Sequence, residues 1–207
     1  GETRKALDKF NEALSLRRAV GDRRGEAETL NNIAAVYWLL GDRQKALEKH
    51  NEVLPLRRAA GDRSGEAQTL NNLGVVHRSF GDLGKALEMY TEALPIYRAL
   101  ADRKGEAAAL NNIGGVHRTS GGLQKALEKY NEALLIRRAI DDRIGEAETL
   151  NHIGLVYDSL GETRKALDKF NEALSLRRAV GDRRGEAETL NNIAAVYWLL
   201  GDRQKAL

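Results

Sequence analysis

The sequence predicts an all-α protein, an α-solenoid built from antiparallel helix pairs. Composition agrees with this fold class, because Pro occurs only twice while the helix-forming residues Ala and Leu are abundant. Each unit of the sequence also contains two stretches whose apolar residues recur at helical spacing. A fixed period of this size is typical of small modules that stack on one another. The 207 residues repeat one unit of 40, which starts at Gly1, Gly41, Gly81, Gly121 and Gly161.

In one repeat, an apolar stripe predicts a first helix over residues 23–39, called helix A below. Gly41 follows it, and glycine tolerates the left-handed backbone conformation that ends many helices. The carboxylate of Asp42 can then cap the next helix. The stripe residues share one face: Ala27, Leu30, Ile33, Ala34 and Tyr37.

A second stripe predicts helix B over residues 42–60. Neither helix can bury its stripe alone, so the pairs must stack into one solenoid over residues 1–207. In chain order we expect helix B at 2–20, pairs at 23–60, 63–100, 103–140 and 143–180, helix A at 183–199 and a helix B stub at 202–207.

Small residues mark the positions where helices should touch closely. In helix A they are Ala34, Gly74, Gly114, Gly154 and Ala194. In helix B an aromatic residue recurs at one position, as Phe10, Tyr90, Tyr130 and Phe170. His50 occupies this aromatic position in one copy, and we expect a core histidine with one satisfied nitrogen rather than a ligand.

Charge and composition exclude several classes of function. The net charge is +3 with both signs interleaved, so the chain lacks the clustered basic face of a nucleic-acid binder. It has no Cys and no apolar run long enough for a membrane span. We find no catalytic or metal-binding constellation and expect no enzyme, no cofactor and a cytoplasmic protein. Paired arginines near the end of helix B are expected to pair with acids.

The pattern Leu-x-x-Ile-Ala-x-x-Tyr-x-x-x-Gly-x-x-x-x-Ala-x-x-x-His-x-x-Val, from Leu30 to Val53, resembles the tetratricopeptide repeat. The usual unit has roughly 34 residues, so this longer one resembles the branch with Pins-type adaptors, kinesin light chains and bacterial arrays. The resemblance implies a right-handed superhelix. It also implies a non-enzymatic scaffold that holds peptide segments of partner proteins in a concave groove lined by the A helices.

The stripe of helix A opposite the core stripe would line that groove. A side-chain amide offers a donor and an acceptor, which suits a peptide backbone. The resemblance assigns such contacts to the second residue of an amide pair, with His152 interrupting the series. Alternatively, these amides tie neighbouring A helices together or cap local backbone. The pairs are Asn31-Asn32, Asn71-Asn72, Asn111-Asn112, Asn151-His152 and Asn191-Asn192.

Specificity should depend on groove positions that vary between copies. We expect a peptide ligand to place an acidic residue near Arg78 and Arg118 and an apolar one near Trp38. One variable position holds, in successive copies, Trp38, Arg78, Arg118, Asp158 and Trp198.

Self-association is the alternative function. Residues 161–207 repeat residues 1–47 letter for letter, and we expect the chain to be a fragment of a longer array. Neither end shows the polar cap that usually closes such an array. Complementary uncapped ends make a head-to-tail contact that does not close, which yields filaments.

Light scattering tests the alternative. If the chain forms head-to-tail filaments, its mass-average molar mass should rise with concentration. A monodisperse monomer at high concentration would contradict self-association.

Overall fold

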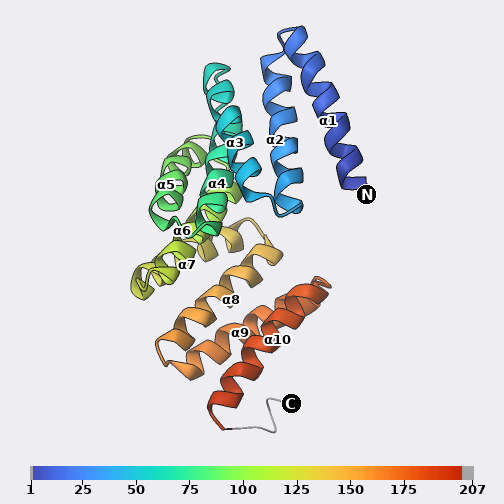
Figure 1. Cartoon of the computed structure of the whole chain (residues 1–207). Coiled ribbons are helices and arrows are strands. Elements are labelled where there is room, and N and C mark those ends of the chain that lie inside the picture. Colours follow the sequence, from blue (N-terminus) through green and yellow to red (C-terminus); the bar gives the residue numbers. More distant parts are fainter. Residues whose placement is uncertain (1, 202–207) are drawn as a thin grey trace. The chain divides into compact units, whose positions relative to one another are not determined.

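Ten α-helices follow one another in the described part of the chain, residues 2–201 of the computed structural model (Figure 1). The helix B stub expected at 202–207 lies outside the described residues. The helices are α1 (Glu2–Ala19), α2 (Arg23–Leu39), α3 (Arg43–Ala59), α4 (Arg63–Ser79), α5 (Leu83–Ala99), α6 (Arg103–Thr119), α7 (Leu123–Ala139), α8 (Arg143–Ser159), α9 (Thr163–Ala179) and α10 (Arg183–Leu199).

Contacts divide the chain into two compact units, one with α1–α5 and one with α6–α10. In the first unit α2 packs on α3 and α4 packs on α5, while α1 lies against α2 and α3 against α4. In the second unit the pairs are α6 with α7 and α8 with α9, and α10 packs on α9. The predicted fold class is confirmed: the chain is an all-α, solenoid-type array of antiparallel helix pairs.

The turns use the start and stop signals that the sequence predicts. Gly41 has a φ of +78°, in the left-handed region, and the side chain of Asp42 accepts a hydrogen bond from the Lys45 backbone N–H. In the turns from helix B to helix A, Gly61 has a φ of +66°, and Ala101 and Asp141 replace this glycine in two later copies with φ values of +53° and +55°. The turn geometry is therefore retained even where the residue does not favour it.

The predicted stripes form the core of each pair. In α2, Leu30, Ile33 and Ala34 are fully buried, as are Ala46 and Val53 in α3. The same positions are buried in the later pairs, so each repeat contributes an equivalent layer. The residues that build the array are thus those that recur in every copy.

Glycine allows helix A to approach an aromatic ring of helix B in most complete pairs. A Cβ on Gly74 would lie 2.4 Å from Cε1 of Tyr90, and one on Gly154 would lie 2.5 Å from Cε1 of Phe170. Both rings are fully buried. The α2–α3 pair differs, because Ala34 and His50 occupy the positions of the glycine and the ring.

Arginines near the ends of the B helices connect successive helices, as expected. In the first unit Nε of Arg58 lies 2.9 Å from the buried Glu66 on α4, and its Nη2 contacts Glu92 on α5. In the second unit Arg138 makes the same two contacts, with Glu146 on α8 and Glu172 on α9. A single arginine therefore forms an ion pair with each of the two helices of the following pair.

Replacing Gly74 by Ala should lower the free energy of unfolding by about 1–2 kcal/mol, because the added methyl presses on the Tyr90 ring. Urea denaturation measures this loss. The variant Gly74→Ala/Tyr90→His recreates the Ala34–His50 combination, so Gly74→Ala should cost nothing in the Tyr90→His background. An equal cost in both backgrounds would contradict this account of the packing.

Candidate functional site

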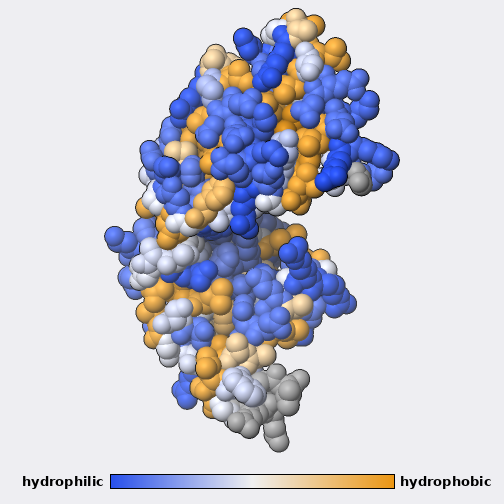
Figure 2. Space-filling view, viewed as in Figure 1, coloured by the Kyte–Doolittle hydropathy of each residue, from blue (hydrophilic) through white to orange (hydrophobic). Residues whose placement is uncertain are grey.

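The surface of α2 opposite the core carries the residues that the sequence assigns to a groove. Asn32 and Ala35 are exposed, Asn31 is half-buried and Trp38 is 38% exposed. Figure 2 shows hydrophobic patches between hydrophilic side chains on one face of the molecule. The α2 surface thus presents an amide series next to an aromatic ring.

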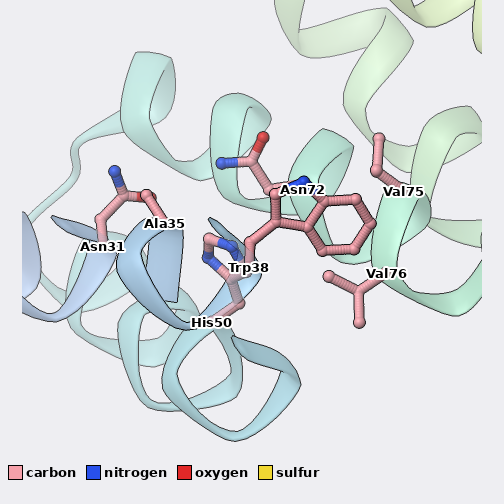
Figure 3. Close-up of a pocket in the computed structure, with 7 residues that line it drawn as sticks. All are labelled: Asn31, Ala35, Trp38, His50, Asn72, Val75 and Val76. Carbon is pink, nitrogen blue, oxygen red and sulfur yellow. The ribbon is translucent and has the colours of Figure 1, made fainter. Parts of the chain in front are cut away.

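A pocket with a volume of about 150 Å³ opens on this surface of the first unit (Figure 3). Helix α2 contributes Asn31, Ala35 and Trp38 to it, α3 contributes His50, and α4 contributes Asn72, Val75 and Val76. In Figure 3 the Trp38 indole extends toward the two valines. Three helices from two successive repeats therefore form one site.

Two buried polar atoms of the pocket residues have no hydrogen-bond partner within residues 2–201. They are Nδ1 of His50 and Oδ1 of Asn31. His50 is only 5% exposed, and burial, assisted by the charge of Arg57, lowers its pKa to about 4. It is a core residue as expected, but the expected hydrogen bond to a ring nitrogen is not present at Nδ1, and its imidazole is neutral at pH 7.

In the second unit the first amide of the pairs on α6 and α8 ties one A helix to the next. Oδ1 of Asn111 on α6 accepts from the Thr149 hydroxyl at 3.4 Å and lies 3.2 Å from Nδ1 of His152, both on α8. Oδ1 of Asn151 accepts from the Thr189 hydroxyl at 3.5 Å and from Nδ2 of Asn192 at 3.0 Å. These amides follow the alternative interpretation, an interhelical tie.

His152 takes the place of the second amide in this tie. Its ring contacts Asn111 just as Asn192 contacts Asn151, and it also stacks on Tyr130 with ring centroids 5.3 Å apart. Burial lowers its pKa to about 4, so the neutral ring donates from Nδ1 to the amide oxygen. In the sequence His152 interrupts the series of amides, but in the structure its ring makes the same contact with a neighbouring first amide as Asn192 does.

The remaining predicted amides differ in exposure. Asn71, Asn72, Asn112 and Asn192 are half-buried, and Asn191 is exposed like Asn32. By contrast, Asn111 and Asn151 are buried at 5% and 1% exposure. In α6 and α8 the first residue of the pair is thus buried, and the second residue, Asn112 or His152, is more accessible.

The variable positions are accessible in both units. Arg78 in the first unit is half-buried, and its charge opposes the burial that raises the pKa of Tyr90 to about 12. In the second unit Arg118 and Asp158 are half-buried and Trp198 is exposed. Cationic, anionic and aromatic side chains therefore follow one another at one position of the repeat.

Sequence reasoning missed the pocket beside Trp38, although a signal for it was present. Ala34 and His50 depart together from the glycine–aromatic combination of the following pairs. Elsewhere in residues 2–201 no group of three or more His, Cys, Asp or Glu side chains is placed to hold a metal ion. None of the described helices is long and apolar enough to cross a membrane.

The chain matches the sequence profile of a known family. The sequence profile of the family described as tetratricopeptide repeat matches residues 1–59, 50–99 and 105–179. No curated protein sequence matches the chain.

Several solved structures share the fold. BtubC (BKLC) from P. vanneervenii is 21% identical with a TM-score of 0.83, over 100% of this chain and 87% of that chain. A putative kinesin light chain from Podosopora anserina is 14% identical with a TM-score of 0.69, over 86% and 89%. A Rap protein complexed with Competence and Sporulation Factor is 16% identical with a TM-score of 0.76, over 97% and 60%. At these identities the likeness concerns the fold alone.

The buried histidines should make stability depend on pH. His50 and His152 have pKa values of about 4 in the folded protein, against 6.5 for the free side chain. Between pH 6.5 and 4, these two histidines therefore bind protons in the unfolded chain but stay neutral in the folded one. Stability is fully present above pH 6.5 and should fall by about 3 kcal/mol per histidine as the pH decreases to 4.

Urea denaturation at several pH values measures this loss. A His50→Gln variant cannot titrate at this position, so its free energy of unfolding should fall less steeply between pH 6.5 and 4.5. Parallel curves for the variant and the parent chain would contradict the assignment to His50.

Proposed function

The chain belongs to the tetratricopeptide repeat family, and on this premise we propose that it is a protein-interaction scaffold that binds extended peptide segments of partner proteins along its A helices. Arrays of this family generally mediate protein–protein interactions. The Rap protein of the same fold was crystallised with Competence and Sporulation Factor, which supports a ligand-binding role for such an array.

The accessible amides of the first unit carry the proposal. Asn32 is exposed on α2 and Asn72 lines the pocket on α4, so both lie on the surface opposite the core. Asn is a mediocre helix former, and its presence is not explained by helix propensity. A carboxamide pairs with the N–H and C=O of a peptide backbone without reading its sequence.

In this proposal, the second amide of each pair makes most of the contacts with the backbone of the bound peptide. Asn111 and Asn151 use their side-chain oxygens for contacts with the next A helix, so they position the groove rather than contact a ligand. Each contact with a second amide contributes roughly 1 kcal/mol. A few such contacts give only millimolar affinity, and side-chain anchors must supply the rest.

Trp38 and Arg78 are the proposed anchors of the first unit. Trp38 offers an aromatic surface for an apolar side chain, and Arg78 offers a cation for an acidic one. Arg118 offers the same in the second unit. Head-to-tail self-association remains the alternative function, and the light-scattering experiment above addresses it.

Peptide selection tests the proposal. Panning a phage-displayed library of random linear peptides should enrich binders, whose affinity fluorescence anisotropy then measures. Asn32→Ala and Asn72→Ala should each weaken binding about fivefold, which corresponds to one net hydrogen bond. Asn51→Ala, an exposed amide on α3, is the matched control and should leave affinity unchanged. The proposal fails if no peptide is enriched or if all three variants bind equally well.

Charge reversal tests the acidic anchor separately. Arg78→Glu should weaken the selected peptides about tenfold and should reduce the dependence of their affinity on salt. Arg43→Glu makes the same change of charge at an exposed position of α3 and should have little effect. Equal losses in both variants would show that only net charge matters, and would refute a specific contact at Arg78.

A further inference from the structure

The pocket beside Trp38 combines an apolar wall with polar atoms that lack partners. Ala35, Val75, Val76 and the Trp38 indole provide the wall. Among the described residues, neither Oδ1 of Asn31 nor Nδ1 of His50 finds a hydrogen-bond partner. A buried polar atom without a partner costs about 1–3 kcal/mol, and a ligand that satisfies both atoms would remove that cost.

The pocket lies where one packing combination is exchanged for another. Where α4 meets α5, Gly74 allows the Tyr90 ring to fill the space between the helices. Where α2 meets α3, Ala34 occupies the glycine position and the smaller imidazole of His50 replaces the ring. The interhelical tie seen at Asn111 and Asn151 is also missing at Asn31, whose oxygen stays unpaired.

Size and charge restrict what the pocket can hold. Its volume of about 150 Å³ matches that of a cavity known to hold one benzene ring. The seven lining residues include no Asp, Glu, Lys or Arg, and His50 is neutral at pH 7. The unpaired oxygen of Asn31 requires a donor and repels an anion. These features favour a neutral ring that carries a hydrogen-bond donor.

We propose that this pocket binds the phenol ring of a tyrosine side chain in the peptide that the A helices hold. The ring packs against Trp38 and the two valines. Because both unpaired atoms are buried, the side chains of Asn31 and His50 turn toward the ring, and the hydroxyl then donates to Oδ1 of Asn31 and accepts from the Nδ1–H tautomer of His50. A phenylalanine would leave both polar atoms unpaired, and a serine would leave most of the volume unfilled. The inference rests on the proposed peptide-binding function and names its apolar anchor.

Phenol and anisole are the probes, because they share the ring but only phenol donates a hydrogen bond. Two-dimensional ¹H–¹⁵N spectra at pH 7 follow the Trp38 indole N–H in a Trp198→Phe background, which leaves a single indole signal. Phenol should shift this signal saturably, with an affinity about fivefold higher than that of anisole, the value of one net hydrogen bond.

Two variants test whether the preference for phenol over anisole depends on the pocket. Asn31→Leu removes the acceptor and should abolish the preference for phenol, whereas Asn51→Leu on α3 should retain it. Ala34→Gly/His50→Tyr installs the combination that packs α4 on α5, so it should fold and lose the phenol-induced shift. Circular dichroism and the unfolding midpoint verify that each variant is folded.

Each outcome decides the inference. A shift that does not saturate, equal affinities for phenol and anisole, or an unchanged preference in Asn31→Leu would overturn it. Peptides enriched without tyrosine, together with no phenol binding, would refute the tyrosine pocket and leave the peptide groove intact. Phenol binding without any enriched peptide would support the pocket and refute the peptide-binding function.

Discussion

The close approach of two helices within each repeat is the constraint on which the rest of the structure depends. A glycine on helix A allows an aromatic ring of helix B to lie where a methyl group would clash, as Gly74 and Tyr90 show. This contact fixes how far apart the two helices of a pair lie. Because the pairs within each unit stack on one another, the same spacing also determines where the outward residues of helix A are presented.

The α2–α3 pair departs from this rule, and the candidate binding pocket lies at that place. Ala34 and His50 replace the glycine and the ring in this pair, and His50 lines the pocket beside Trp38. In the second unit an amide oxygen closes the corresponding contact between A helices, as Asn151 does with Asn192. At Asn31 that oxygen is unpaired, and a packing variation thereby creates a polar site within an otherwise apolar pocket.

The network of arginines explains why so many charges recur in a chain with a small net charge. Arg58 contacts an acid on each helix of the following pair, one of them the buried Glu66. Such contacts are local and involve groups of both signs, so they leave little excess charge for a nucleic acid. Recurrent charges of this kind support the array.

Period, caps and apolar stripes determined the fold from the sequence alone, because each is a local property of the chain. Every copy of the unit carries its own helix signals, as Gly41 and Asp42 do, and five copies make the interpretation unambiguous. Which amides are accessible was decided only by the tertiary structure. Asn31 and Asn111 occupy the same position in the repeat, yet one is unpaired beside a pocket and the other is bonded to the next helix. Their environments differ because hydrogen bonds and packing volume depend on residues about 40 positions away, which no local pattern contains.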